Sequence, residues 1–155
     1  MKIKIRKANI EDLDEIMILI ECITDFHYKL DKYYKSFVEY QGLNEYIQQQ
    51  LEDENTKILL AEVDEKIVGF IVGVILKAPG YIVPKKIGNI DNAFVKEDYR
   101  HQKIGENLIK ELFKWFKEKK VKHIELSVDA RNTIGINAWR KFGFFDFRIE
   151  MKKEL

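Results

Sequence analysis

The sequence is poor in the residues that support cysteine-based or metal-based chemistry. It has one cysteine and three histidines among 155 residues. A single cysteine excludes an intramolecular disulfide and a cysteine-rich metal cluster. His27, His101 and His123 lack the spacing typical of zinc ligands. Cys22 lies on an apolar, helix-like stretch, which predicts a small core residue rather than a nucleophile.

The sequence also lacks a strong net charge and a long hydrophobic run. Its formal net charge is +1, so no overall basic field favours nucleic-acid binding. The longest apolar run, residues 67–76, is short of the roughly 20 residues that cross a bilayer, and the N-terminus has no secretory h-region. These absences predict a cytoplasmic protein that binds neither nucleic acid nor membrane. With 46% hydrophobic residues, residues 1–155 fit one globular domain.

The first part of the chain predicts a strand, helices and a hairpin. Residues 2–8 alternate as a half-buried strand does, and Asn9 is a suitable cap for the helix that follows. Residues 26–42 are rich in aromatic residues and less regular. Further along we expect a helix over 43–52, strands over 57–63 and 66–76 joined by a tight turn, a loop over 77–88 and a strand over 89–95.

The second part alternates helices and strands. A strong helical pattern runs from Gly105 to about Lys120, and a short helix begins at Asn132 and stops near Gly143. HIELSVDA (123–130) and FFDFRIEMK (144–152) alternate as strands. Hairpins and βα crossovers together predict an α/β fold with a mixed, mostly antiparallel sheet of six to seven strands and helices on both faces.

One stretch has a geometry that suits an anion. The strand-like IDNAFV (90–95) leads to DYRHQKIGENLIKEL (98–112), which is a polar turn followed by a helix. The helix N-terminus offers unpaired N–H groups and a partial positive charge. Neither the P-loop nor the dinucleotide-binding pattern is present. Taken alone, the stretch also fits an ordinary strand-to-helix turn.

Two motifs carry a resemblance to a known family. RHQKIG (100–105), preceded by Val95 and Tyr99, resembles the acyl-CoA motif of the GNAT superfamily of N-acetyltransferases. DARNTIGINAWRKFGF (129–144) looks like the second signature of that family. The order of predicted elements matches from residue 2 to residue 152, and the motifs are most similar to the diamine and polyamine N-acetyltransferase branch.

The resemblance implies a fold, a co-substrate and a set of binding residues. The sheet is expected to splay at the acyl-CoA site, and acetyl-CoA is the implied co-substrate, with no metal. Amides of residues 101–106 would hold the pyrophosphate, and the strand 93–95 would pair with the pantetheine arm. Asn132 would contact the pantetheine or fix the loop beside it. The implied CoA-binding residues are Ala93, Phe94, Val95, Arg100, His101, Gln102, Lys103, Ile104, Gly105, Glu106, Asn132 and Trp139.

Two positions depart from the family pattern. Lys103 replaces a motif glycine. We expect it to donate its backbone N–H with a negative φ, its side chain lying either near the phosphates or in solvent. Trp139 stands where the family often has a tyrosine, and an indole is not a practical proton donor. A thiolate whose conjugate acid has a pKa of roughly 8.5 is an acceptable leaving group near neutral pH, so loss of the tyrosine slows the reaction without preventing it. Hydroxyls that could replace the tyrosine belong to Tyr28, Tyr33, Tyr34 and Tyr81.

The predicted reaction is direct attack of a primary amine on acetyl-CoA in a ternary complex. Asp91 is the candidate base, either directly or through water, with an amine anchor or a solvated strand residue as the alternatives. The aromatic segment FHYKLDKYYKSF (26–37) is expected either to border the acceptor or to pack over the sheet edge, and His27 either to line the acceptor pocket or to be structural. The acceptor is either a small molecule or a protein amine. Alternatives are a weakly active acyl-CoA sensor or regulatory module, and a protein lysine or N-terminal acetyltransferase. The apolar last strand favours a homodimer.

Overall fold

The computed structural model describes residues 2–155 and has a central sheet of five strands. The strands lie in the order β1 (Ile3–Lys7), β2 (Thr56–Val63), β3 (Lys66–Lys77), β4 (Lys86–Val95) and β5 (Ile124–Glu125). Neighbouring strands are antiparallel except β4 and β5, which are parallel. The predicted α/β class and mixed sheet are confirmed, whereas the expected number of strands, six to seven, is too high.

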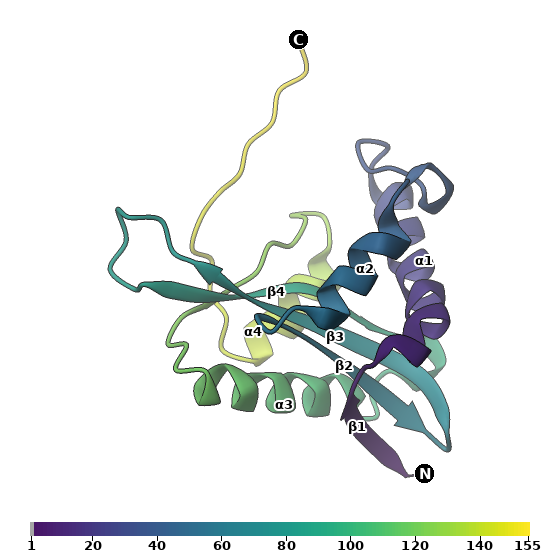
Figure 1. Ribbon diagram of the computed structural model, residues 1–155. Coiled ribbons are helices and arrows are strands. Elements are labelled where there is room, and N and C mark those ends of the chain that lie inside the picture. Colours follow the sequence, from purple (N-terminus) through teal and green to yellow (C-terminus); the bar gives the residue numbers. More distant parts are fainter. Residues whose placement is uncertain (1) are drawn as a thin grey trace.

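Helices cover both faces of the sheet (Figure 1). Helices α1 (Leu13–Leu30) and α2 (Leu43–Glu52) pack on one face, and α3 (Ile104–Glu118) with α4 (Thr133–Lys141) on the other. Short 3-10 turns precede α1, α2 and α3 at Ile10–Asp12, Phe37–Glu39 and Glu97–Tyr99. None of the helices in residues 2–155 combines the length and apolarity needed to cross a membrane.

The two-residue period of β2 builds both halves of the core. Ile58 and Leu60 point toward α1 and α2, while Leu59 and Ala61 point toward α3, and each is at most 2% exposed. Alternation is expected for a strand that is buried on both faces. At Gly73, an added Cβ would lie 2.5 Å from Leu112 Cδ1, so the missing side chain lets α3 pack close to the sheet.

Several predicted elements are confirmed. The Asn9 side chain accepts a hydrogen bond from the Glu11 N–H at 2.8 Å and so caps the turn that leads into α1. Helix α2 has the predicted bounds, and the β2–β3 turn uses positive φ at Asp64 and Glu65. Helix α1 continues to Leu30, which is further than its regular pattern indicated, and β4 starts at Lys86, inside the expected loop.

Three predictions about individual segments are wrong. Residues 144–152 form no strand, and of HIELSVDA only Ile124–Glu125 pairs, because β5 contacts β4 alone and no second neighbour extends it. Cys22 is exposed rather than buried, because it lies on the outward face of α1, opposite Ile16, Leu19 and Ile20, which enter the core.

Candidate active site

The sheet opens between β4 and β5, as expected. β4 pairs with β5 only at Gly88–Ile124 and Asn89–Glu125. From Ile90 to Val95 it pairs with β3 alone. Residues 93–95 therefore have no neighbouring strand on the β5 side. The Val95 carbonyl accepts a hydrogen bond from the Arg100 side chain, and the other backbone groups on that side can pair with an extended ligand, as an added strand would.

The turn between β4 and α3 concentrates unpaired amides. His101 and Lys103 have φ of 62° and 63°, and α3 begins immediately after them at Ile104. The first backbone hydrogen bond of the helix runs from the Asn107 N–H to the Lys103 carbonyl at 2.9 Å. Within residues 2–155, the amides of 101–106 find no backbone acceptor. Successive N–H groups of this kind, at a helix N-terminus, form an anion-binding concavity.

Lys103 corrects one expectation. Its φ is positive, not negative, and it is the N-cap residue of α3. The family pattern has glycine here because a left-handed conformation costs an ordinary residue about 1 kcal/mol. The lysine side chain is exposed and lowers the pKa of Glu106 slightly, after the larger effect of Lys110.

Side chains of the turn brace it and leave its amides free. The Arg100 Nε donates to the Val95 carbonyl and the Gln102 Nε2 donates to the Asp98 carbonyl, each at 3.1 Å. Ile104 is buried in the α3 side of the core. Glu106 forms an ion pair with Lys110 one helical turn later. The His101 side chain is exposed.

Gly105 joins the turn to the open strand. An added Cβ at this position would point toward the Val95 side chain, with 4.0 Å between that Cβ and Val95 Cγ2. Apart from the adjacent residues and the backbone of α3 itself, no other atom in residues 2–155 lies within that distance. The backbone of Gly105 therefore faces the gap next to the end of β4, where a side chain would occupy the space.

Trp139 lies on α4, and Asn132 is the N-cap residue of that helix. The Asn132 side chain accepts a hydrogen bond from the Gly135 N–H at 2.9 Å and caps the helix. Trp139 packs against Phe142 and Phe144, with ring centroids 6.4 Å and 5.6 Å away. Asn132 thus caps the N-terminus of α4, and Trp139 packs the helix against the α3 side of the core.

Asp91 lies at a β-bulge. Val72 pairs with Asn92 and Gly73 with Ile90, so Asp91 is the extra residue of β4. A bulge changes the direction of the side chains around it. As a result both Asp91 and Asn92 line one pocket, and the Asn92 amide donates to the Asp91 carboxylate at 3.2 Å.

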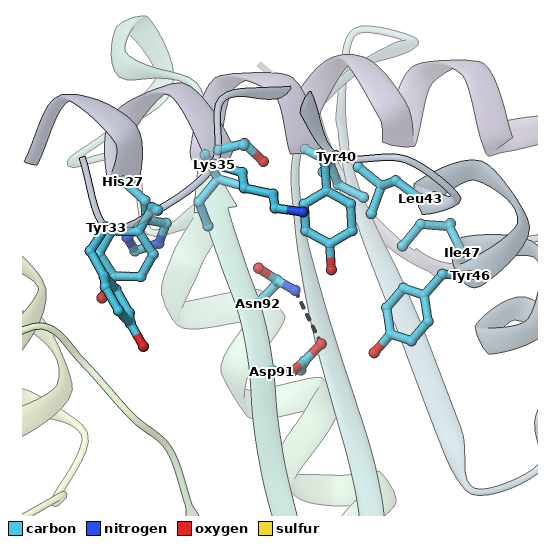
Figure 2. Close-up of a pocket in the computed structure, with 13 residues that line it drawn as sticks. His27, Tyr33, Lys35, Tyr40, Leu43, Tyr46, Ile47, Asp91 and Asn92 are labelled. Atoms are coloured by element: carbon cyan, nitrogen blue, oxygen red, sulfur yellow. Dashed lines mark hydrogen bonds between the residues drawn. The ribbon is translucent and has the colours of Figure 1, made fainter. Parts of the chain in front are cut away.

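The pocket lies next to this bulge and has a volume of about 430 Å³. Figure 2 shows Asp91 and Asn92 on the strand, with Lys35 and Tyr40 above them, Tyr46 to the right and His27 and Tyr33 to the left. Besides these it is lined by Ile20, Ile23, Thr24, Tyr34, Leu43 and Ile47. The lining mixes aliphatic and aromatic side chains with several polar groups, a composition that can hold and orient a small polar molecule.

Three pocket residues have shifted pKa values. Burial, opposed by Asp129, lowers the pKa of His27. Tyr34 donates its hydroxyl to Asp129 at 3.2 Å, and burial followed by the nearby carboxylate raises its pKa. Burial and then Asp91 raise the pKa of Tyr46. These groups are therefore neutral near pH 7, and the formal charges of the lining are those of Asp91 and Lys35.

Sequence reasoning found part of this pocket. His27, Tyr33 and Tyr34 line it, whereas Tyr28 does not and Tyr81 is 84% exposed in the β3–β4 loop. Tyr40, Tyr46 and Lys35 were not singled out. The sequence did contain a signal for Tyr46. It lies three residues after Leu43 and next to Ile47, which places its ring at the edge of the buried face of α2.

Comparisons with known proteins agree with this geometry. Residues 23–144 match the acetyltransferase (GNAT) family. The spermidine N(1)-acetyltransferase of Thermoplasma acidophilum is 30% identical over 171 aligned positions, covering 99% of each chain. A mutant of the BH1408 protein from Bacillus halodurans superposes with a TM-score of 0.90 at 22% identity, over 98% of this chain and 99% of that one. AAC(6′)-Iy, solved with a CoA-linked bisubstrate analogue, has a TM-score of 0.81 at 15% identity, over 100% and 99%.

The open β4 edge, the amide-lined turn and the adjacent pocket define an acyltransferase architecture. The chain belongs to the GNAT acetyltransferase family, as its two motifs predicted.

Proposed function

We propose that the protein is an N-acetyltransferase that moves the acetyl group of acetyl-CoA to a primary amine in a ternary complex, using residues 1–155 as one domain. One observation carries the proposal. The strand β4 presents an open backbone edge at 93–95 and, at its bulge, the carboxylate of Asp91 in the adjacent pocket. Donor and acceptor sites thus share one strand.

The residues present fit coenzyme A. The amides of 101–106 suit a pyrophosphate, which needs several N–H donors and a positive field. The open edge at 93–95 suits the amide groups of a pantetheine arm. Gly105 keeps the space between the turn and Val95 free of a side chain. His101 and Lys103 leave their side chains in solvent, where Lys103 adds positive charge beside the turn.

The reaction forms one N–C bond and breaks one C–S bond. The amine nitrogen attacks the thioester carbonyl, and the thiolate of coenzyme A departs. An alkylammonium with a pKa of about 10.4 has no free lone pair, so it must first lose a proton. Asp91 takes that proton, directly or through water, and its carboxylate also attracts the ammonium before it is deprotonated. After the N–C bond forms, the nitrogen releases its second proton to water, which gives the neutral amide.

The departing thiolate needs no tyrosine at position 139. A thiol of pKa roughly 8.5 is a tolerable leaving group near neutral pH, and water can return the proton. Tyr33 and Tyr34 are the two tyrosine hydroxyls, among the four weighed from the sequence, that line the pocket. Tyr34 already donates to Asp129, which leaves the Tyr33 hydroxyl as the better alternative donor.

The pocket favours a small amine over a protein side chain. Its volume of about 430 Å³ lies within the usual range for a small-molecule site, and its aromatic walls suit a cation. The relative from Thermoplasma acidophilum is named for spermidine, so polyamines come first among the acceptors to test. Lys35 disfavours a polyamine, because its ammonium would repel a second cationic centre of the substrate nearby.

Amine-dependent thiol release tests the proposal. Acetyl-CoA is incubated with spermidine, monoamines, amino acids, an aminoglycoside and a lysine peptide, and products are identified by mass spectrometry. We expect at least one small amine to release thiol and gain one acetyl group. Tight acetyl-CoA binding with no acetylated product from any amine would instead support the sensor alternative.

A further inference from the structure

The acceptor pocket has one formal charge of each sign, carried by different elements. The carboxylate belongs to Asp91 at the bulge of β4, and the ammonium belongs to Lys35 in the segment between α1 and α2. Figure 2 shows the Lys35 side chain crossing the top of the pocket, with Asp91 below it. The other lining residues are apolar, or polar without a formal charge near pH 7. The pocket therefore has an anionic end and a cationic end.

Other carboxylates beside the pocket already have cationic partners. Tyr34, a pocket residue, donates its hydroxyl to Asp129, and Asp129 forms an ion pair with Arg131 at 2.8 Å. Asp31 binds Arg131 at 2.9 Å and Lys152 at 2.8 Å. These groups neutralise one another, so they leave the charge of the Lys35 ammonium uncompensated.

Glu39 lies with Lys35 in a neighbouring hollow, but its carboxylate is engaged elsewhere. Its Oε2 accepts hydrogen bonds from both the N–H and the hydroxyl of Ser36. These two contacts lower the pKa of Glu39 more than the charge of Lys35 does. No salt bridge within residues 2–155 joins Lys35 to a carboxylate. The Lys35 ammonium is therefore free to bind a ligand.

Neutral polar groups complete both ends of the pocket. Figure 2 shows the Tyr40 hydroxyl pointing into the pocket near Lys35, and within residues 2–155 this hydroxyl is bound to no other residue. An ammonium with a hydroxyl beside it suits a carboxylate or a phosphate. At the other end, the Asn92 amide donates to one oxygen of Asp91, which leaves the second oxygen to accept an ammonium.

We propose that the acceptor is a short molecule with a primary amine at one end and an anionic group, a carboxylate or a phosphate, at the other. The inference rests on the proposed function, because the amine must lie at Asp91 for the far end to reach Lys35 and Tyr40. The anionic group takes no part in the bond changes and selects the substrate. A diamine would place its second ammonium against Lys35, and a simple alkylamine would leave Lys35 unpaired.

Matched acceptors test the proposal in the natural, full-length protein. Thiol release from acetyl-CoA is measured with 4-aminobutyrate, butylamine and 1,4-diaminobutane, which share an amine and a four-carbon chain, and with shorter and longer members of each series. Aminoalkyl phosphates distinguish the two kinds of anion. We expect kcat/KM for the best anionic acceptor to exceed that for the matched alkylamine by about fivefold or more, and that for the matched diamine by a larger factor.

The outcomes separate this inference from the proposed function. If an alkylamine or a diamine is acetylated at least as well as its anionic counterpart at every chain length, the inference is wrong, and the N-acetyltransferase proposal stands. If no amine of any series releases thiol, both are wrong.

Substitutions of Lys35 give a readout that a purely structural role would not produce. Lys35→Glu should invert the order of the acceptors and place the diamine first, while Lys35→Arg should keep the natural order. Lys32→Gln is the control, because Lys32 lies over the Tyr28 ring, 3.4 Å from its centroid, and does not line the pocket. An equal rise in KM for all three acceptors in Lys35→Glu would overturn the inference.

Glu39→Gln tests the rival reading of the neighbouring hollow. If Glu39 held the second ammonium of a diamine, this variant would raise the KM of the diamine alone, and that result would also overturn the inference. We expect the order of the acceptors to stay unchanged, with the affinity for coenzyme A within about twofold of the natural value.

Discussion

The two sides of the active site recognise their ligands by different means. On the coenzyme side, residues 101–106 offer backbone amides, and the side chains around them brace the turn. On the acceptor side, the pocket offers side chains from α1, the 33–40 segment, α2 and β4. A site built from backbone amides tolerates many side-chain substitutions but requires one particular backbone conformation. A site built from side chains can change its ligand preference with a single substitution. Substitutions on one side should therefore leave binding on the other side nearly unchanged.

Gly105→Val has the largest expected effect. The new side chain would fill the space toward Val95, where the protein leaves a gap, and should weaken coenzyme A binding at least about 100-fold by isothermal titration. Gly80→Val is the matched control, because Gly80 has open space around it and should bind normally. Unchanged affinity in Gly105→Val would refute the pyrophosphate assignment.

Asp91→Asn should affect the other side. The substitution keeps the shape and removes the base, so the rate of thiol release should fall by about 10²-fold or more. The affinity for coenzyme A should stay within about twofold of its original value. The pH profile of the rate should also lose the step that reports ionisation of the carboxylate. Asp64→Asn, on the distant β2–β3 turn, is the control, and a rate loss shared by both variants would argue against a role for Asp91 in the chemistry.

Lys35→Ala should change which amine is preferred. Removing the ammonium from the pocket lining should lower the KM for spermidine several-fold, since like charge no longer opposes its second cationic centre. The KM for a monoamine should change less. Equal changes for both amines would show that Lys35 does not select between them.

Lys103→Gly should have the smallest effect on binding and a small favourable effect on stability. Glycine adopts the observed φ of 63° without cost, so the free energy of unfolding should rise by about 1 kcal/mol and Tm by about 2–4 °C. Lys85→Gly, in the β3–β4 loop, is the control and should be slightly destabilised. A lower Tm for Lys103→Gly would show that the lysine side chain stabilises the turn.

The same contrast explains what the sequence could predict. The coenzyme turn and Asn132 lie in contiguous motifs, so their placement follows from local order. α2 and the β2–β3 hairpin were predicted because their periodicity and turn residues are local signals. The positive φ of Lys103 was missed, since a lysine gives no sign of a left-handed conformation.

The acceptor side depends on contacts between distant segments. The bulge at Asp91 follows from the register of β4 against β3, which no local pattern reports. Tyr40 and Tyr46 join the pocket only after α1 and α2 dock on the sheet. Residues 144–152 have the alternating pattern of a strand but form none, and the free edge of β5 has no second strand beside it in the part of the chain that the structure describes.

An amide-resolved titration tests the central claim most directly. Coenzyme A is added to ¹⁵N-labelled protein, and chemical-shift changes are followed by ¹H–¹⁵N NMR. We predict that the largest changes fall on the amides of 101–106 and 93–95, with small changes at Tyr40 and Tyr46 in the acceptor pocket. Saturable binding that leaves the amides of 101–106 unmoved would contradict the account.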